Sequence, residues 1–365
     1  MSKLNGFLED VLVLDLSRHL PGPLATQLLA DMGARVVKIE SPAGDELRQI
    51  GPRNAQGGGC YFDAIHAGKE VLTLDLKTGA GRERFLALAD QADVLVESFR
   101  PGVMSRLGLG SDALRERNPG LIYCALSGYG RGGPLQDVAG HDGNYVALAG
   151  ALYANGSKGL PLPFMPPVAD TTGSLVGLSA ILGALIRRGR SGQGCDIDLG
   201  LADVLMPLQT FQLAELAATA AVPQPEQALF NGGVAYYRVY ATADNRHIML
   251  GAFEPKFWGA FCMAAGRPDW VSRHDDPLPQ RALIAEVQEF FAGLTQAEAG
   301  ERFAQVDCCL SPVLDLSEAV DSDHIRARGL VRRSAEGQLQ ALFPVCIDGE
   351  TPAERPPVKK FQGLP

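Results

Sequence analysis

The stretch Val11-Leu-Val-Leu-Asp-Leu-Ser17 begins the segment that decides the fold. It is almost continuously apolar, as expected for a strand buried on both faces. The segment from Pro21 to Gly33 carries leucine and alanine at helical spacing and ends at a glycine, which suits a helix C-terminus. A second apolar run, Arg35-Val-Val-Lys-Ile-Glu40, follows. Strand, helix and strand within about 30 residues indicate a right-handed βαβ unit, so the sequence predicts a parallel sheet.

The same alternation continues for the next two hundred residues or so. Further strands are predicted at Val71–Asp75, Asp93–Glu97, Leu121–Leu126 and Cys195–Leu199. Helices are predicted at Gly81–Gln91, at Ser111–Asn118 with Ser111 as N-cap, at Thr171–Arg188 and at Ala202–Ala220. The fold class is therefore α/β, with a Rossmann-like, doubly wound large domain at 1–221.

A proline-rich linker, Val222 to Glu226, separates this domain from a smaller α+β domain at 222–328. There, Tyr236–Tyr240 and His247–Gly251 are predicted to be strands joined by the turn Ala243–Arg246. Helices containing Trp258, Phe290 and Phe303 follow. Residues 329–365 are rich in proline and glycine and are expected to return to the large domain.

Composition excludes several classes of function. The chain has 365 residues, 46% hydrophobic and 21% charged, which is typical of a globular protein. The net charge of −9 disfavours nucleic acid and anionic membranes as partners, so basic contacts to an anionic substrate must be local. The longest apolar stretch, Leu175 to Ile186, is shorter than the roughly 20 residues needed to cross a bilayer. The seven cysteines form no C-x-x-C pair and the N-terminus lacks a signal pattern, so a cytoplasmic location is expected.

Several motifs carry only weak functional signals. Gly128-Tyr-Gly-Arg-Gly-Gly133 matches a dinucleotide fingerprint, but Pro134 follows and no helix is expected until about Tyr145, so a glycine-rich turn is favoured. Cys308 and Cys309 follow an aspartate, which favours core packing over thiol chemistry. The histidines never fall at metal-ligand spacing with cysteine or a carboxylate, so no metal site is predicted.

Three segments supply groups for acid–base chemistry. His141 lies in Ala139-Gly-His-Asp-Gly-Asn-Tyr145, where a purely structural histidine is the alternative. Asp170 precedes a long apolar helix, where it, Thr171 or Thr172 would also serve as an N-cap. Glu254 follows an apolar strand end, where a salt-bridged surface glutamate is the alternative. Together they provide a base, an acid and a carboxylate that could orient the base.

At these residues the sequence resembles the family III CoA-transferases and their relatives, the 2-methylacyl-CoA racemases. The resemblance runs almost from end to end. It is carried by Gly22-Pro23, Val36–Glu40, Leu74–Lys77, Asp93–Gly102, Arg106–Gly108, Ser127–Gly130, His141-Asp142, Val168–Asp170, Gly251–Pro255 and Phe257.

The resemblance implies a fold, a ligand and roles for individual residues. It implies an interlocked homodimer that binds acyl-CoA substrates, with no cofactor beyond the coenzyme A of the substrate. In the racemases, the residues matching His141 and Asp170 are the two bases, and the residue matching Glu254 partners the histidine. The family's CoA contacts correspond to Leu74, Lys77, Ser98, Phe99 and Arg106.

Three functions remain open after this comparison of motifs. The first is α-epimerisation of a 2-methylacyl-CoA through an enolate. The second is CoA transfer between carboxylic acids through an aspartyl-CoA intermediate on Asp170, and the third is acyl-CoA binding without catalysis. Many transferases carry tyrosine where His141 stands, and some have a long glycine run where this chain has only Asn231-Gly-Gly233, so the racemase branch is favoured. Ser41, where racemases often have arginine, and Tyr61–Lys69 instead resemble the transferase branch.

Overall fold

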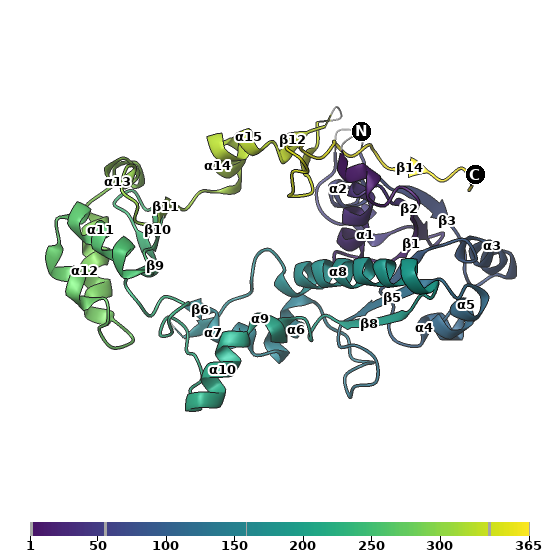
Figure 1. The fold of residues 1–365 in the computed structure, drawn as a ribbon, viewed down its shortest axis with the longest axis horizontal. Helices are drawn as coiled ribbons and strands as arrows, with labels where there is room; N and C mark the ends of the chain where they lie inside the picture. The colour runs from purple at the N-terminus through teal and green to yellow at the C-terminus, as the bar shows by residue number, and fades with distance from the viewer. Residues whose placement is uncertain (1–2, 55–56, 158, 335–336, 365) are drawn as a thin grey trace. The chain divides into compact units, whose positions relative to one another are not determined.

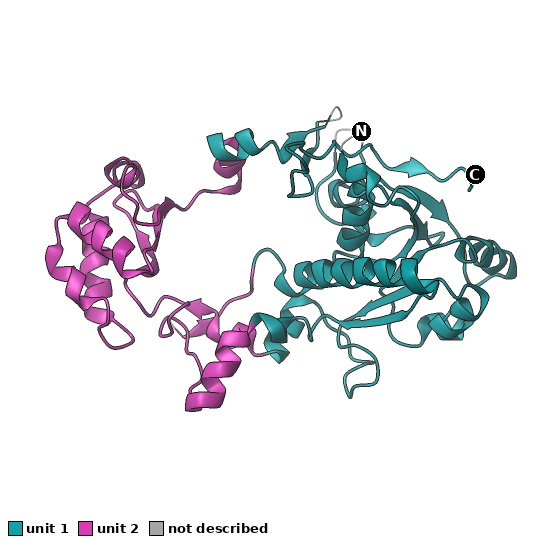
Figure 2. Cartoon of the chain, in the orientation of Figure 1, with its two compact units in different colours: residues 1–149, 165–208, 322–365 teal, residues 150–164, 209–321 magenta. Residues whose placement is uncertain are grey.

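The computed structural model of the chain describes residues 3–54, 57–157, 159–334 and 337–364. The chain forms two compact units, which are coloured separately in Figure 2. Unit 1 comprises residues 1–149, 165–208 and 322–365, and unit 2 comprises residues 150–164 and 209–321.

Unit 1 is built on a parallel sheet (Figure 1). In the described residues the sheet has seven strands in the order β14-β3-β2-β1-β4-β5-β8, and each neighbouring pair is parallel. The strands are β1 (Leu12–Leu16), β2 (Arg35–Glu40), β3 (Glu70–Thr73), β4 (Val94–Glu97), β5 (Ile122–Ser127), β8 (Asp196–Gly200) and β14 (Lys359–Lys360). The prediction of an α/β fold with a parallel sheet is therefore confirmed.

Helices cover both faces of this sheet. Helices α1 (Pro21–Asp31) and α8 (Val168–Ser191) pack against each other and against the sheet strands. On the opposite face, Leu14 and Leu16 of β1 join a core with side chains of α3 (Gly79–Ala89), α4 (Val103–Arg106) and α5 (Ser111–Arg117). Because side chains alternate along a strand, Val13 and Asp15 face the α1 side. Within the described residues, α8 alone is long and apolar enough to cross a membrane by length and composition, and it serves here as a sheet-covering helix.

The described part of unit 1 also contains several shorter elements. They are η1 (Lys3–Gly6), η2 (Glu46–Arg48), α2 (Cys60–His66), α6 (Asp142–Leu148), α9 (Leu205–Leu208), α15 (Asp323–Arg328), β12 (Val331–Arg333) and β13 (Leu339–Ala341). The C-terminal segment belongs to this unit because β14 pairs with β3. It is also held by a buried bidentate ion pair, in which Arg355 Nε and Nη2 each lie 2.7 Å from an oxygen of Asp31 in α1.

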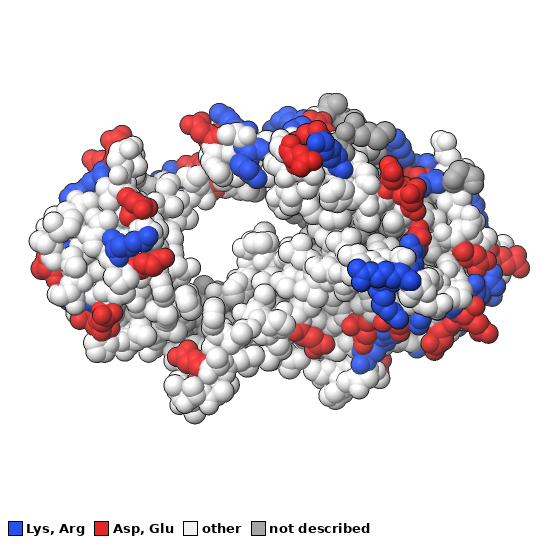
Figure 3. All heavy atoms as spheres, in the orientation of Figure 1, with Lys and Arg blue, Asp and Glu red and all other residues white. Residues whose placement is uncertain are grey.

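The surface of unit 1 carries charges of both signs. Acidic and basic side chains intermingle over the face seen in Figure 3, in keeping with 42 acidic and 33 basic residues. Basic side chains gather at the C-terminal end of α8, whose last turn contains Arg188 and Arg190. This placement is favourable because the C-terminus of a helix carries partial negative charge.

Unit 2 contains an antiparallel sheet packed against helices. In its described part the sheet has the order β11-β10-β9, made by β9 (Tyr237–Ala241), β10 (His247–Gly251) and β11 (Leu310–Pro312). The helical elements are α7 (Ala151–Ala154), α10 (Thr210–Thr219), α11 (Pro255–Ala265), η3 (Pro268–Arg273), α12 (Arg281–Ala292), α13 (Gln296–Phe303) and α14 (Leu316–Asp321). A short hairpin is formed by β6 (Gly156–Ser157) and β7 (Leu160–Pro161). Trp258, Phe261 and Trp270 are at the centre of the core.

The two units divide at different points from the domain boundaries expected from the sequence. Residues 150–164 belong with unit 2, where Asn231 Nδ2 donates to the carbonyl of Ala154 at 3.0 Å. The helix predicted over Ala202–Ala220 is wrong as a single element, because it is split into α9 and α10. Pro207 lies within α9, and the break falls at Gln209, where the chain passes from unit 1 to unit 2.

The starts of α5 and α6 also differ from expectation, as do those of α3 and α8, which begin two and three residues earlier than predicted. Ser111 is not the N-cap of α5, because Gly110 takes that position and Ser111 is the first helical residue. Helix α6 begins at Asp142, three residues before the predicted start at Tyr145. These shifts are local and leave the order of elements unchanged.

Replacing Arg355 with methionine should lower the free energy of unfolding by about 3–5 kcal/mol, because the buried Asp31 carboxylate loses its partner. The matched control is Arg117→Met, which removes a bidentate pair with Asp90 whose side chains are 47% and 38% exposed. That variant should change little, since solvent screens the pair. Urea denaturation of both variants tests this, and equal losses of stability would contradict it.

Candidate active site

The candidate site lies at the carboxyl edge of the parallel sheet. Strand order reverses between β1 and β4, and open α/β sheets bind ligands outside the strand ends at such a point. The two strand ends are tied together, because Arg18 N donates to Ser98 Oγ at 2.8 Å. Two pockets open here. We call them the β2-side pocket, which Leu74 and Lys77 line, and the α6-side pocket, which His141 and Asp170 line.

The α6-side pocket brings together two of the three predicted catalytic residues. It has a volume of about 400 Å³, and both His141 and Asp170 line it. His141 is the N-cap residue of α6, and its backbone N–H donates to Asn144 Oδ1 at 3.0 Å. Its imidazole is exposed, and its ring centre lies 6.1 Å from that of His19. The imidazole is therefore accessible to a ligand in the pocket.

Asp170 is held at the N-terminus of α8 by a second carboxylate. Asp142 Oδ1 accepts hydrogen bonds from the backbone N–H groups of Ala169 and Asp170, at 2.7 and 3.0 Å. Asp170 is the third residue of α8. The N-cap residue is Pro167. Burial, together with the negative charge of Asp142, raises the pKa of Asp170 to about 6, although His141 opposes the shift. A carboxyl group with such a pKa can give and take protons near neutral pH.

The glycine-rich segment before this site is a turn, as expected. A Cβ on Gly128 would lie 2.7 Å from Cε1 of Tyr145, so a side chain there would collide with the ring. Gly130 and Gly132 have φ of +71° and +82°, which favours glycine. No helix begins among the described residues between Gly128 and Asp142, so the strand–turn–helix geometry of a dinucleotide fingerprint is not formed.

The predicted CoA contacts are distributed around the two pockets. Leu74, Lys77 and Phe99 line the β2-side pocket, whose volume is about 170 Å³. Phe99 also lines the α6-side pocket, together with Ser98. Arg106 is the last residue of α4 and is exposed, and it lines neither of these two pockets.

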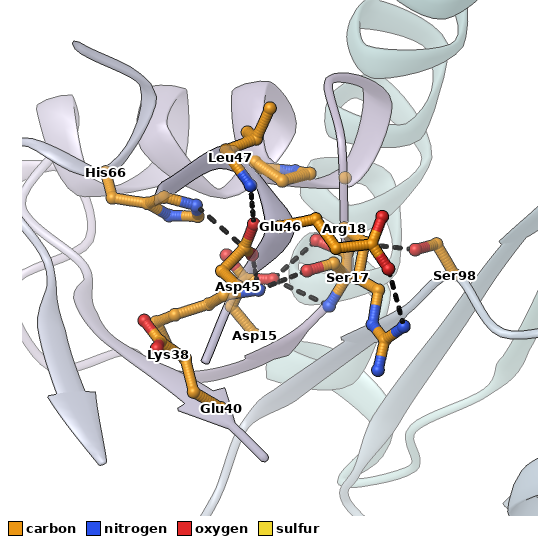
Figure 4. A network of polar contacts seen from close by, with 12 residues as sticks. Asp15, Ser17, Arg18, Lys38, Glu40, Asp45, Glu46, Leu47, His66 and Ser98 are labelled. Carbon is orange, nitrogen blue, oxygen red and sulfur yellow. Dashed lines mark hydrogen bonds and ion pairs between the residues drawn. The ribbon is translucent and has the colours of Figure 1, made fainter. Parts of the chain in front are cut away.

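Lys38 and Asp45, which line the β2-side pocket, belong to a cluster of buried charges, part of which is drawn in Figure 4. Lys69 Nζ lies 3.0 Å from Asp15 Oδ2 and also donates to Thr26 Oγ1 at 2.8 Å. Lys38 Nζ lies 3.1 Å from Asp45 Oδ2 and also donates to the carbonyl of Ser17. These pairs connect the ends of β1 and β2 with the segments that follow them.

His66 lies between the two pairs. Its Nδ1 is 3.2 Å from Lys69 Nζ, and its Nε2 is 3.8 Å from Asp45 Oδ2. Burial lowers the pKa of His66 well below its usual value, and the neighbouring lysines Lys69 and Lys38 lower it further. An uncharged His66 leaves the cluster with two positive and two negative groups, which is the balance that burial requires.

Glu254 is the N-cap residue of α11 in unit 2, and two residues separate it from the end of β10. Its side chain is exposed and makes no capping hydrogen bond with the helix. His141 belongs to unit 1, so the predicted pairing of Glu254 with His141 stays a prediction.

Three residues of the site were not predicted from the sequence as pocket or positioning residues. Arg18 lines both pockets, His19 lines the α6-side pocket, and Asp142 positions Asp170. Arg18 and His19 lie in the loop that follows β1, so their place after the central strand of a parallel sheet is a usable signal. His19 also has φ of +61°, a conformation that is uncommon for residues with a side chain.

Two further expectations from the sequence concern the cysteine pair Cys308-Cys309 and metal binding. Cys308 is buried in the core of unit 2, where burial raises its pKa to about 11, whereas Cys309 is exposed. The prediction that these cysteines pack in the core is therefore confirmed for Cys308 and wrong for Cys309. In the described residues, no group of three or more histidine, cysteine or acidic side chains is arranged to hold a metal ion.

Comparison with known proteins connects this geometry to a family. The chain is 35% identical to human alpha-methylacyl-CoA racemase over 95% of its own length and 87% of the racemase. It is 32% identical to the succinyl-CoA:mesaconate CoA-transferase of Haloarcula marismortui, over 89% of this chain and 85% of that one. A CAIB/BAIF family protein from Brucella suis has the same fold, with a TM-score of 0.84, 26% identity and coverage of 96% and 95%. The family model for CoA-transferase family III matches residues 8–357, and the chain therefore belongs to that family.

Proposed function

We propose that the protein epimerises the α-carbon of 2-methylacyl-CoA esters, with His141 and Asp170 as its two bases. The observation that carries this proposal is that both side chains line one pocket, in which the pKa of Asp170 is raised to about 6. Inversion through a planar enolate needs a proton acceptor on one face and a donor on the other. The similarity to alpha-methylacyl-CoA racemases supports the same reaction.

The proposed reaction has two proton transfers. One base takes the α-proton beside the thioester carbonyl, and the electron pair moves onto the carbonyl oxygen to give an enolate. The other group then gives a proton to the opposite face of the α-carbon. Histidine suits this exchange because its ordinary pKa is near neutrality, and the raised pKa of Asp170 brings its carboxyl into the same range.

The substrate's coenzyme A is proposed to lie along the carboxyl edge of the sheet. Leu74 and Phe99 offer apolar contacts to the adenine, and Lys77 offers a positive charge to a phosphate. Ser98 lies where the thioester end would enter the α6-side pocket, and Arg106 would meet a phosphate from the exposed end of α4. No cofactor beyond this coenzyme A is needed for the proposed reaction.

CoA transfer between carboxylic acids is the second candidate. It is favoured by the similarity to a succinyl-CoA:mesaconate CoA-transferase and by the accessibility of Asp170 from the pocket. In this reaction an oxygen of Asp170 attacks the thioester carbon and the CoA thiolate leaves, which gives a mixed anhydride. The thiolate then attacks the aspartyl carbonyl and releases the donor carboxylate, leaving an aspartyl-CoA thioester.

A homodimer is part of the same proposal. Large apolar side chains are exposed on two long helices, one in each unit: Leu175, Val176 and Ile186 on α8, and Phe211, Leu213 and Leu216 on α10. Exposed apolar side chains that form a contiguous patch mark interaction sites, and we propose that these side chains contribute to one. The interlocked pairing that the family resemblance implies would cover them with a second copy of the chain.

In deuterated water, wild-type enzyme should exchange the α-proton of a chiral 2-methylacyl-CoA without any acceptor acid. His141→Ala should lower exchange from one enantiomer at least about a hundredfold, and Asp170→Asn should show the opposite preference, because each base serves one face. Glu254→Gln should cost less than either, since it would only loosen His141. Proton NMR of the recovered ester measures all three.

The transferase alternative gives a different pattern in that experiment. A covalent acyl or CoA adduct on Asp170 in peptide mass analysis, with no α-exchange in wild type, would replace the racemase with the transferase. Binding of acyl-CoA with neither reaction would leave only the binding function.

Asp170→Asn should stabilise the protein in a pH-dependent way. The folded pKa of Asp170 is about 6 against an ordinary value of 3.8, so the folded state binds more protons than the unfolded state between about pH 4 and 6. Wild-type stability therefore falls as pH rises through that window. The variant should be more stable by about 1–2 kcal/mol at pH 7, allowing for partial exposure, and equal to wild type below pH 4. Urea denaturation at both pH values measures this difference, and equal stability at pH 7 would contradict it.

Loss of the dimer should coincide with unfolding, because interlocked chains cannot separate while folded. Sedimentation and far-UV circular dichroism should therefore report the same urea transition, and its midpoint should rise with protein concentration. A folded monomer on dilution would contradict the interlocked arrangement.

A further inference from the structure

We propose that Arg18 binds an oxyanion of the CoA ester at the junction between the two pockets. This inference rests on the proposed function for its substrate class, an acyl-CoA, but not on which reaction follows binding. Arg18 follows the end of β1 after one intervening residue, at the point where strand order reverses.

The position of Arg18 is the first argument. Both Arg18 and Phe99 line the β2-side pocket as well as the α6-side pocket. A ligand that reaches from Lys77 to His141 must therefore pass these two residues. The backbone of Arg18 is fixed for this role by the hydrogen bond from its N–H to Ser98 Oγ (Figure 4).

The second argument is that Arg18 forms only a weak ion pair, with Glu46. Its Nη1 lies 3.6 Å from Glu46 Oε1, and the two side chains are 43% and 59% exposed. Two neighbouring cations are held much more firmly. Lys38 is buried against Asp45 at 3.1 Å, and Arg48 forms a bidentate pair with Glu40 at 2.8 and 3.0 Å. Arg18 can therefore exchange its partner for a ligand at little cost.

The chemistry of the guanidinium is the third argument. Its central carbon lies 5.4 Å from the centre of the Phe99 ring, so one aromatic contact holds the group at the junction. Guanidinium groups bind carboxylate and phosphate oxygens through paired, charge-assisted hydrogen bonds. Two parts of an acyl-CoA offer such oxygens: the phosphates of CoA, and a second carboxylate where the acyl group carries one.

Calorimetric titration of Arg18→Gln with three ligands tests the proposal and separates these sources. The ligands are free CoA, 2-methylpropanoyl-CoA and succinyl-CoA. Loss of a charge-assisted contact should weaken binding by about tenfold to a hundredfold. Equal weakening for all three places the phosphates on Arg18, and weakening for succinyl-CoA alone places the acyl carboxylate there. Unchanged affinity for all three would overturn the proposal.

Glu46→Gln is the matched control for a purely structural role. If Arg18 only held η2 through Glu46, both substitutions would break the same pair and change affinity in the same direction. If Arg18 binds the ligand, Glu46→Gln frees the guanidinium and should tighten binding a few-fold, opposite to Arg18→Gln. Weakening of similar size in both variants would overturn the proposal.

A conservative variant guards against a folding defect. Arg18→Lys keeps the charge without the paired geometry, so it should recover part of the affinity that Arg18→Gln loses. Circular dichroism of each variant should match wild type. Because calorimetry needs no turnover, an enzyme without α-exchange that still shows these affinity changes would refute the racemase proposal and leave the role of Arg18 intact.

Discussion

Asp15 carries an ionised carboxylate on the central strand of the sheet, and an unpaired charge there would cost several kcal/mol. Burial raises the pKa of Asp15, but Lys69, Lys38, His66 and the Ser17 hydroxyl together outweigh it, so the pKa lies well below its usual range. Lys69 comes from the segment after α2 and Thr26 from α1, and both bind the same carboxylate. Because the buried Asp15 carboxylate must be paired, the segment that carries Lys69 has to pass close to β1. This requirement constrains the path of the chain after β2, beside which the β2-side pocket opens.

Most of the large sheet could be predicted from the sequence because its strands are nearly continuous apolar runs. The predicted strand over 35–40 matches β2, and the others were found within one or two residues. The errors are of two kinds, one at the division into units and one a local shift of a helix start. The split of the helix over Ala202–Ala220 follows the division into units, and Ser111 is displaced as N-cap by Gly110. The periodicity of apolar residues does not indicate where one unit ends, and the presence of a serine does not show that it is the N-cap.

In the candidate site, some residues could be predicted from short motifs, whereas the roles of others depend on contacts between segments far apart in the sequence. His141 and Asp170 could be predicted because each lies in a short motif, and the structure brings them to one pocket. The roles of Asp142 and Arg18 depend on contacts across 28 and 80 residues, with the N–H of Asp170 and with Ser98 respectively. Such contacts become visible only once the order of strands and the start of α8 are known. Glu254 also lies in a recognisable motif. It belongs to unit 2, however, whereas His141 belongs to unit 1, so its predicted pairing with His141 stays a prediction.

The ionisation state of Asp170 does not by itself decide between the two proposed reactions. With a pKa of about 6, the carboxyl is mostly ionised at pH 7, and an ionised carboxylate in a partly buried pocket is both a base and a nucleophile. The α-carbon and the carbonyl carbon of a thioester are only about 1.5 Å apart, so a small displacement of the substrate exchanges one target for the other. The relatives at 32–35% identity likewise carry the names of both a transferase and a racemase. The residues that place the thioester, rather than the reactive carboxylate alone, would then select the reaction.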